Sequence, residues 1–495
     1  MIEMQTMAPL MFAGLVIVML IGFPVAFSLA ALGLAAGFVS IELGFFPPQF
    51  MANLPLRVFG ILQNELLLAI PFFTFMGAIL ERCGLAEDLL EGTGQLFGSV
   101  PGGLAYAVIV VGAILGAITG TVAASVIAMG VISLPIMMRY GYDMRLATGV
   151  IAASGTITQV IPPSLVLVVL ADQLGRSVGD MYAGAIGPSI AQVAIFIAYI
   201  FVLSLLRPKM MPPLPPEART LSGWALWRRV LWGMVPSVVL IFLVLGTIFL
   251  GLATPTEAGA MGAVGAMILA ALHKRLTWPL VSQAMDSTMK ITAMVIFILI
   301  GSTVFSLVFQ GVDGGIWIEH MLTSITGGSA TTFLIIVNLF VFFLAFFLDF
   351  FEIAFIIIPL LAPVADKLGI DLVWFGVLLC VNMQTSFMHP PFGFALFYLR
   401  GIAPKEVKSS DIYLGAIPWV AMQLLLVAAL IAFPQMVTAF IDKPDLGDVD
   451  KVRMDVPGEG SSAPGSGSEN LHNPFGASPG GSADDSLKDP FGGKR

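Results

Sequence analysis

Long apolar segments, each close to the length of a membrane-crossing helix, follow one another from Met7 to Phe440. Short turns rich in Gly, Pro and charged residues separate them. A helix needs roughly 20 apolar residues to cross the hydrocarbon core of a bilayer. The composition agrees: 58% of residues are hydrophobic and 11% are charged, against about a quarter charged in globular domains. The pattern predicts an all-α polytopic membrane protein.

The same series of segments occurs in both halves of the chain, which a charged and Pro-rich linker, Arg207 to Arg229, joins. In the first half we expect membrane helices at 7–22, 24–42 and 66–82, an amphipathic stretch at 53–65, a short helix at 86–97, a long apolar block at 103–139, an interrupted span at 144–174 and a last span at 181–206. In the second half we expect 229–251, 256–273, an amphipathic stretch at 277–290, 291–310, a block at 331–366, an interrupted span at 371–400 and a last span at 411–440.

Two stretches that lie 228 residues apart align without a gap, the first from Gly116 and the second from Leu344. The aligned pairs are Pro135 with Pro363, Gly141 with Gly369, Asp143 with Asp371, and Pro162-Pro163 with Pro390-Pro391. Each copy ends in a polar patch before Pro-Pro, where a membrane helix should not break. Interrupted segments at matching positions of two halves indicate the binding site of a secondary transporter.

The blocks 103–139 and 331–366 determine the predicted topology. At a rise of 1.5 Å per residue, about 36 residues give two arms of roughly 27 Å, which is short for two crossings of a ~30 Å core joined by a loop. The small and polar centre of the first block, Gly116 to Ser125, suits a re-entrant hairpin tip buried in protein. With both blocks as hairpins, each half crosses five times, and the odd number makes the repeats inverted.

The distribution of positive charge agrees with this count. Most lysines and arginines fall on one predicted side, which the positive-inside rule makes cytoplasmic. That side contains Arg82, Arg139, Arg145, Arg207, Lys209, Arg219, Arg228, Arg229, Lys274, Arg275, Lys290, Arg400, Lys405 and Lys408, and the other side contains Arg57, Arg176, Lys367 and Lys443. We therefore expect a cytoplasmic linker and both termini outside. The start, MIEMQTMAP, lacks the positive segment of a cleaved signal, so the first apolar run should be retained.

Two carboxylates, Asp349 and Glu352, lie within apolar sequence of the second block. An ionised carboxylate at the bilayer centre costs about 2.5–3.5 kcal/mol on insertion scales. Such a residue indicates a functional site, with a cation as the obvious partner. The alternative is that both carboxylates lie near the membrane surface and cap a helix.

The polar patches before Pro-Pro offer hydroxyls, amides and backbone carbonyls freed by proline. Hard cations such as Na⁺ take oxygen ligands, and half-helix N-termini suit a substrate carboxylate. We expect sodium ligands at Gly120, Thr121, Ser154, Thr156, Thr158, Asp349, Asn382, Gln384 and Thr385, and substrate contacts at Gln159, Pro162, Ser386, His389, Pro390 and Glu352. The alternative is a proline kink stabilised by Ser and Thr side chains.

Two further polar residues each allow more than one interpretation. His389 precedes Pro390 and either contacts substrate or relays a proton, or is a packing histidine of the interior. Glu257, in ATPTEAGA (Ala253 to Ala260), is more simply a helix-capping residue, with Thr254 or Thr256 as the cap. The four histidines and two cysteines show no metal-ligand spacing, so no cofactor is expected beyond a coupling ion.

The motifs ATPTEAGA at 253–260 and FLDFFEIAFIIIPLLAPV at 347–364, with the two Pro-Pro breaks, closely resemble the large membrane (M) subunit of TRAP transporters, the tripartite ATP-independent periplasmic transporters of bacteria. The resemblance covers about residues 5–441 and is nearest the mannitol/chloroaromatic or 2-oxo-acid branch. It implies an elevator-type transporter in the inner membrane, in which the hairpins and broken helices slide against a scaffold. A Na⁺ gradient would drive import of an organic acid delivered by a soluble periplasmic binding protein.

The resemblance also implies a separate small four-helix membrane subunit, because no such segment is fused to this chain. The expected division is scaffold helices of the first repeat (1–102), the first hairpin and broken helix of the transport domain (103–175), the last helix and the linker (176–230), scaffold helices of the second repeat (231–330), the second hairpin and broken helix (331–401), the last helix (402–442) and a tail (443–495). The tail is rich in Gly, Ser, Pro and Asp, a composition typical of disorder.

Other classes of protein are weighed against this interpretation. A stand-alone sodium- or proton-coupled anion carrier of related elevator fold would need neither partner protein. A channel or structural membrane component would show no Na⁺-dependent uptake. An ATP-driven pump is disfavoured because the chain has no G-x-x-x-x-G-K-[ST] loop. No feature indicates catalysis or nucleic-acid binding, and membrane lipids are the expected surroundings.

Overall fold

The computed structural model describes residues 4–21, 23–119, 122–219, 223–346, 348–390 and 393–441. These residues form helices and connecting turns, without a β-strand among them. The first half contains α1 (Met4–Ile21), α2 (Val25–Glu42), α3 (Leu54–Leu62), α4 (Ala69–Arg82), α5 (Leu85–Leu96), α6 (Gly103–Thr119), α7 (Val122–Arg139), α8 (Met144–Thr156), α9 (Leu165–Leu174) and α10 (Val178–Leu206). The second half contains α11 (Gly223–Phe249), α12 (Pro255–Leu272), α13 (Trp278–Gly311), α14 (Gly314–Thr326), α15 (Ala330–Leu344), α16 (Phe350–Glu352), α17 (Ile358–Lys367), α18 (Leu372–Met383), α19 (Phe394–Ile402), α20 (Ser409–Ala432) and α21 (Gln435–Thr438).

The repeat predicted from the sequence is present in the helix boundaries. Val122 begins α7, and Phe350, 228 positions later, begins α16; a single turn of π-helix joins α16 to α17. The two arms end at Arg139 and Lys367, which are also 228 positions apart. Both interrupted spans break as predicted, α8 from α9 and α18 from α19, and a short 3₁₀ helix follows the first piece each time. The two halves therefore share one order of elements.

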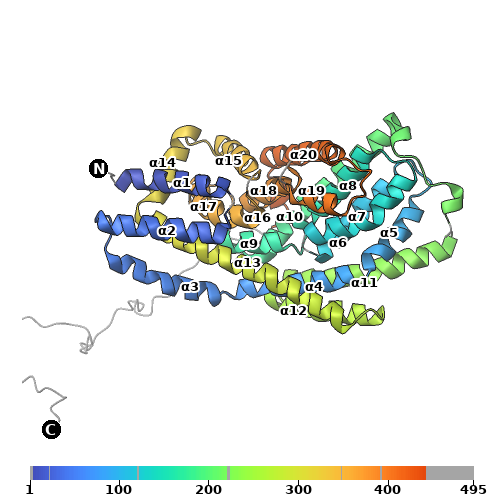
Figure 1. Cartoon of the computed structure of the whole chain (residues 1–495), viewed down its shortest axis with the longest axis horizontal. Helices are drawn as coiled ribbons and strands as arrows, with labels where there is room; N and C mark the ends of the chain where they lie inside the picture. The colour runs from blue at the N-terminus through green and yellow to red at the C-terminus, as the bar shows by residue number, and fades with distance from the viewer. Residues whose placement is uncertain are drawn as a thin grey trace, which may run out of the picture. The chain divides into compact units, whose positions relative to one another are not determined.

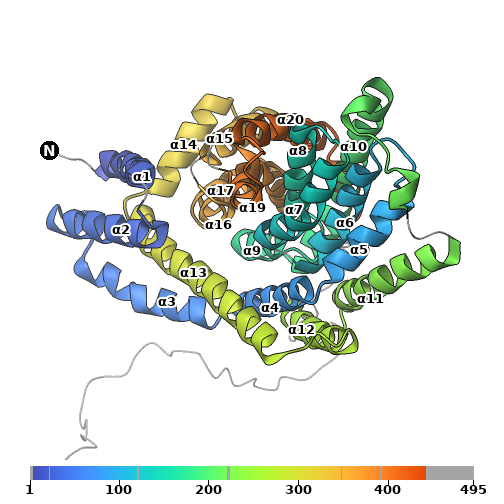
Figure 2. The ribbon, with the colours of Figure 1, turned by 45° about the vertical axis from the view of Figure 1, so that its right-hand side comes forward.

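In Figure 2 most of the helices fall into two groups. One is a band of α2, α3, α13, α4, α12 and α11, and the other is a cluster of the hairpins, the broken helices, α10 and α20. In the band the two halves exchange partners, because α2 packs on α13 and α4 packs on α12. Glycine permits one of these close crossings: a Cβ at Gly33 of α2 would lie 2.9 Å from the Phe305 Cα on α13. Small residues let membrane helices approach in this way.

Within the cluster, each first hairpin arm lies against the broken helix of its own half. A Cβ at Gly112 of α6 would meet the side chain of Ser154, and one at Gly116 would lie 2.9 Å from the Thr158 Cα. In the second half α15 packs on α18 in the same way. The polar patches of the breaks are therefore packed against hairpin arms. Figure 1 shows α15 beside α18.

The structure corrects the expected elements of the second half in two ways. The segments 277–290 and 291–310 form one 34-residue helix, α13, because no Gly or Pro separates the amphipathic turns from the apolar ones. The helix α14 was not predicted; it corresponds to α5 of the first half and is bent by 111° from α15. The capping prediction at Glu257 is confirmed, with Thr254 as the cap of α12 in a reciprocal capping box.

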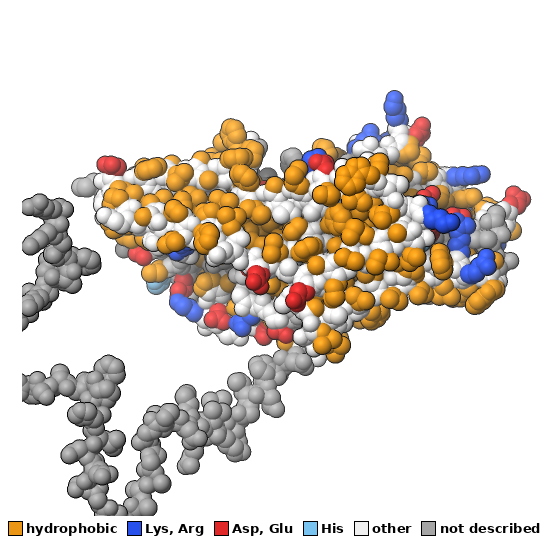
Figure 3. Space-filling model, turned by 90° about the horizontal axis from the view of Figure 1, so that it is seen from below, with side chains coloured by type: hydrophobic (Ala, Val, Ile, Leu, Met, Phe, Trp, Pro, Cys, Tyr) orange, Lys and Arg blue, Asp and Glu red, His pale blue; other side chains and the backbone are white. Residues whose placement is uncertain are grey.

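Length and composition of the described helices fit a multi-pass membrane protein. Seven are long and apolar enough to cross a bilayer, or up to nine if each of two bent pairs is one span. The sequence predicts ten crossings, and two of them are the interrupted spans, α8 with α9 and α18 with α19. The pieces of these spans are each too short to cross a bilayer alone, so helix length does not test the number of crossings. Figure 3 shows a face dominated by apolar side chains, with Lys and Arg gathered toward the end where Figure 1 places α5 and α11. Exposed apolar surface on this scale marks membrane contact.

Candidate functional site

A cavity of about 230 Å³ lies where both hairpins and both broken helices meet. The first residues of four helices line it: Val122 and Ala123 of α7, Leu165 and Val166 of α9, Phe350 and Phe351 of α16, and Phe394 of α19. These helices are repeat partners, α7 with α16 and α9 with α19. Gln159, Asp349, Phe387 and Tyr398 complete the inner wall, and Ile291 and Met294 of α13 form the side toward the band of helices.

The electrostatics of this cavity favour a small anion. A helix N-terminus carries roughly half a positive charge, and four such ends converge here, two of them capped by side chains: α9 by Ser164 and α16 by Asp349. No Lys or Arg lies among the residues that line the cavity. The Tyr398 hydroxyl and the Gln159 amide supply hydrogen bonds beside a largely aromatic wall. A carboxylate with a compact organic body matches this combination.

Asp349 lies at the cavity and is also the N-cap of α16. Its Oδ1 accepts a hydrogen bond from the Glu352 backbone N–H at 2.9 Å, and Glu352 Oε2 accepts one from the Asp349 N–H at 3.0 Å. Both carboxylates therefore cap the helix, as the alternative weighed from the sequence expected; its placement of them near the membrane surface stays a prediction. Asp349 nevertheless lines the cavity, whereas Glu352 does not. The two predicted site residues thus differ in position.

The patch of the first half brings buried oxygens together at the break between α8 and α9. Ser154, Thr156 and Thr158 have no exposed surface, and Gln159 is 4% exposed. Ser154 Oγ, Thr158 Oγ1 and Gln159 Oε1 lack a hydrogen-bond partner among the described residues. Buried oxygens without partners are costly unless a ligand satisfies them. This patch is therefore suited to coordinate a cation.

The patch of the second half is more fully bonded. Asn382 donates to the Asn338 backbone carbonyl at 2.8 Å, and Thr385 Oγ1 donates to the Asn382 carbonyl at 2.7 Å. Asn382 Oδ1 and Ser386 Oγ have no partner in the described part of the chain. The two breaks therefore use different side-chain chemistry at equivalent backbone positions.

Gln384 belongs to a buried amide cluster that connects the two halves. Its Oε1 accepts from Gln192 at 2.6 Å and from Gln423 at 3.2 Å, and Gln423 also donates to Thr156 Oγ1 at 3.3 Å. Thr156 and Gln384 are equivalent positions of the repeat. The cluster ties the two helix breaks to α10 and α20, so it holds the cavity-lining segments in place.

The remaining predicted residues lie away from the cavity or outside the described residues. His389 is 1% exposed, with its ring stacked on Phe346 at 4.1 Å and edge-on to Phe342 at 4.5 Å. The ring thus packs between aromatic side chains, and a role of His389 toward substrate or a proton stays a prediction. Pro162 is buried, Pro390 is half-buried, and neither lines the cavity. Gly120 and Thr121 lie outside the described residues.

Three polar residues of the site were missed from the sequence: Gln192, Gln423 and Asn338. Each is a polar side chain inside a long apolar helix, the signal that identified Asp349, and each is at most 5% exposed. The aromatic lining was missed as well, because Phe residues are too frequent in apolar segments to stand out. The structure also shows a contact between the groups of helices: Asn64, at the start of the turn before α4, donates to Asp172 Oδ1 of α9 at 2.6 Å.

The duplicated halves, the paired helix breaks and the shared anion-suited cavity define a polytopic helical membrane transport protein. The chain belongs to the DctM component family of tripartite ATP-independent periplasmic transporters, whose model matches residues 12–436. The family resemblance stated from the motifs is thereby confirmed.

Relatives of known name agree with this assignment. The C4-dicarboxylate TRAP transporter large permease protein DctM of Rhodobacter capsulatus is 30% identical, over 84% of this chain and 94% of that protein. The sialic acid TRAP transporter large permease protein SiaM of Vibrio cholerae is 27% identical, over 84% and 93%. The crystal structure of the Alcanivorax borkumensis YdaH transporter shares the fold, with a TM-score of 0.56 at 15% identity, covering 79% of this chain and 89% of that one.

Proposed function

We propose that this chain is the large permease subunit of a TRAP system that imports an organic acid with a sodium gradient. The observation that carries the proposal is the cavity where four helix N-termini converge beside Asp349. Helix N-termini stabilise a carboxylate without a buried lysine or arginine. The relatives' names include a C4-dicarboxylate and sialic acid, which are both organic acids. These observations support a carboxylate as the substrate class.

Sodium coupling is supported by oxygens at the first helix break and at the cavity, where Gln159 and Asp349 form part of the lining. In the first half Ser154, Thr158 and Gln159 offer buried side-chain oxygens without partners, and in the second half Asp349 offers a carboxylate. We place one Na⁺ site in each half, between the hairpin tip and the helix break. A carboxylate in the cavity would then be held partly by the bound cations, so ions and substrate would bind together.

An elevator movement is the transport step that suits the two groups of helices. The cavity is closed on one side by apolar side chains of α13, Ile291 and Met294. A cluster that carries the cavity past an apolar band would expose it first to one side of the membrane and then to the other. The Asn64–Asp172 hydrogen bond joins α9 to the band, so it would have to break during this movement.

Two partner proteins and an inner-membrane location belong to the proposal. Membership of a tripartite periplasmic family supports a separate small four-helix membrane subunit and a periplasmic binding protein that delivers the substrate. The chain itself would be inserted in the bacterial inner membrane, where a Na⁺ gradient is available.

Uptake into proteoliposomes tests the proposal. The purified chain, with its small subunit and binding protein, is reconstituted and given radiolabelled C4-dicarboxylates, 2-oxo acids and sialic acid. We expect one class to accumulate only with an inward Na⁺ gradient, with a Hill slope for Na⁺ near two. Uptake that is equal with Na⁺ and with choline would contradict sodium coupling. Transport without the binding protein would instead support the stand-alone carrier.

A further inference from the structure

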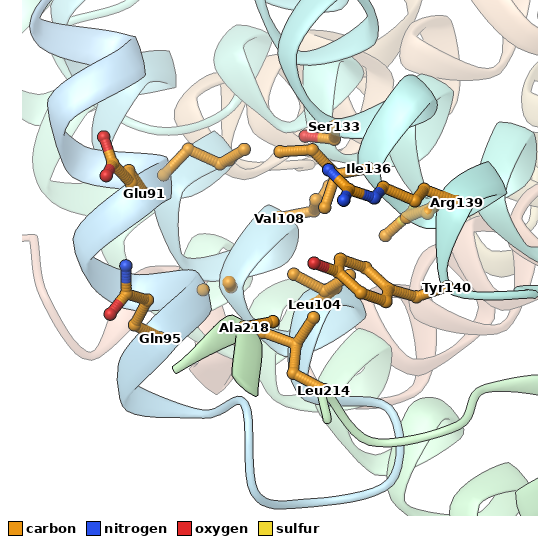
Figure 4. A pocket seen from close by; sticks show the side chains of 14 residues that line it. Glu91, Gln95, Leu104, Val108, Ser133, Ile136, Arg139, Tyr140, Leu214 and Ala218 are labelled. Carbon is orange, nitrogen blue, oxygen red and sulfur yellow. The ribbon is translucent and has the colours of Figure 1, made fainter. Parts of the chain in front are cut away.

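A second cavity, of about 310 Å³, lies away from the transport site, between α5, the first hairpin and the linker. This is near the lower end of the range for small-molecule sites, roughly 300–1,000 Å³. In Figure 4, Arg139 and Tyr140 reach across the cavity from the end of α7, and Glu91 and Gln95 of α5 form the opposite wall. Its apolar lining includes Leu104 and Leu214.

The walls of this cavity are held in place by backbone hydrogen bonds. Leu214 of the linker donates to the Gly98 carbonyl at 2.8 Å, and Gly102 donates to the Met211 carbonyl at 2.9 Å. Asp143 donates to the Met210 carbonyl at 2.9 Å. The linker therefore bridges both ends of the first hairpin and forms one fixed side of the cavity.

The equivalent place in the second half is filled by the chain itself. Lys367 ends the second hairpin as Arg139 ends the first, and Glu319 of α14 corresponds to Glu91 of α5. Lys367 Nζ and Glu319 Oε2 lie 2.5 Å apart. This ion pair connects α14 to the end of the second hairpin. Two leucines, Leu322 and Leu361, are buried there at 7% and 4% exposure.

At these positions the first half has smaller residues, and its cation, Arg139, forms no ion pair with a carboxylate of the described residues. Gly94 stands at the equivalent of Leu322, and Ser133 at the equivalent of Leu361; both line the cavity. Glu91 is paired with Arg229 at 2.7 Å and not with Arg139. Arg139 forms no ion pair with a carboxylate of the described residues, and its guanidinium carbon lies 5.8 Å from the centre of the Tyr140 ring. Ser133 is 2% exposed, and its hydroxyl has no partner in the part of the chain that the structure describes.

We propose that this cavity binds a small amphipathic carboxylate, whose anionic group takes the place beside Arg139 that the Glu319 carboxylate takes beside Lys367. The Ser133 and Tyr140 hydroxyls would bond the same group, and the apolar body would fill the space that two leucines fill in the second half. An arginine binds a carboxylate in bidentate geometry, which gives the site a preference for this anion. Such a ligand would contact both α5 and the end of the first hairpin, and would hold the two together.

Protection of an introduced cysteine tests binding directly. Both native cysteines, Cys83 and Cys380, are fully buried, so a cysteine at Ala218, on the cavity wall, can be labelled selectively. We expect sodium octanoate, below its critical micelle concentration, to slow alkylation of Ala218→Cys about fivefold or more, as near-saturating occupancy requires. Glu217→Cys, on the exposed neighbouring residue, is the matched control and should be unaffected. Octan-1-ol, which lacks the charge, and succinate, which lacks the apolar body, should protect poorly.

Variants of the proposed site separate specific binding from partition into the detergent or lipid. Arg139→Gln should abolish protection by octanoate, and Arg139→Lys should retain part of it. Gly94→Leu with Ser133→Leu copies the second half and should also abolish protection; a Cβ at Gly94 meets only the Leu104 Cδ2, at 3.4 Å. Equal protection in Arg139→Gln and in the parent, or protection by octan-1-ol or succinate equal to that by octanoate, would overturn the proposal.

The effect on transport rests on the proposed function and is measured separately. In counterflow exchange, which needs no ion gradient, octanoate should lower the exchange rate of the parent protein relative to its own uninhibited rate. The same ratio should be closer to one in Arg139→Gln. If octanoate protects the cysteine but no substrate exchanges, the proposed function fails while the binding site stands.

Discussion

The two helix breaks occupy equivalent places in the repeat and differ in their side chains. At the first break, short hydroxyls and an amide present buried oxygens without partners, at Ser154, Thr158 and Gln159. At the second, Gln384 and Thr385 are bonded to neighbouring helices or to the backbone, while Asn382 Oδ1 and Ser386 Oγ lack partners among the described residues. Asp349 of the second hairpin adds a carboxylate at the cavity. The repeat therefore preserves where the backbone opens, while each half contributes a different part of the binding chemistry.

The asymmetry has a structural basis in the buried amide cluster. Gln384 bonds to Gln192 and Gln423, whereas its repeat partner, Thr156, accepts from Gln423 and otherwise bonds within its own helix, to the Ala153 carbonyl. A longer side chain at the second break thus reaches across the interface between the halves. The first break has one such tie, at Thr156, and the oxygens of Ser154, Thr158 and Gln159 remain available for a ligand.

The experiment with the largest expected effect asks whether the two halves of the chain have opposite orientations in the membrane. Five crossings in each half predict that the linker is cytoplasmic and that residue 441 is periplasmic. Green fluorescent protein fused after Lys209 should fluoresce, and the same protein fused after Ile441 should not, because it does not fold when exported unfolded. Alkaline phosphatase fusions at the same two positions should give the opposite result. Fluorescence of both fusions would mean parallel repeats.

The second test removes the charge that only the second half supplies. Asp349→Asn keeps a capping side chain but loses the carboxylate at the cavity, so Na⁺-stimulated uptake should fall about 10–100-fold, the equivalent of roughly 1.5–3 kcal/mol for a charged contact. Asp371→Asn is the matched control, since Asp371 caps α18 by accepting from the Trp374 N–H at 2.9 Å and does not line the cavity. An equal loss in both variants would assign Asp349 to capping alone.

Sequence patterns predicted the backbone of this protein better than its side-chain contacts. Paired prolines and a fixed spacing locate the breaks before α9 and α19, because the missing amide ends a helix wherever it lies. They do not reveal that Asp349 both caps a helix and faces a cavity, since this depends on packing between segments far apart in the chain. His389 and Gln384 looked alike as polar residues near a break, yet one lies between two phenylalanines and the other in an amide cluster.

The amide cluster itself provides the third test. Gln384→Leu removes the partner of the Gln192 amide and one of the two acceptors of Gln423, which keeps Thr156; an unsatisfied buried amide costs about 1–3 kcal/mol. Thr156→Val, at the equivalent position, removes one acceptor and should cost less. Melting temperatures in detergent should therefore fall in the order parent, Thr156→Val, Gln384→Leu. The reverse order would mean that the first half, and not the second, anchors the junction.

The smallest expected effect concerns the two helix pairs that the halves exchange. At Gly33 an added Cβ would press on the backbone of Phe305, at 2.9 Å from its Cα, whereas at Gly262 it would meet the flexible end of Met76, at 2.6 Å from Sδ. Backbone cannot move as a thioether can, and overpacking costs about 1–3 kcal/mol where nothing gives way. Gly33→Ala should therefore lower the melting temperature more than Gly262→Ala. Gly246→Ala of α11, where a Cβ would meet nothing within 4 Å, should be neutral or slightly stabilising because alanine favours helix. Equal losses at Gly33 and Gly262 would show that both crossings are equally rigid, and that the α2–α13 pair is no tighter than its counterpart.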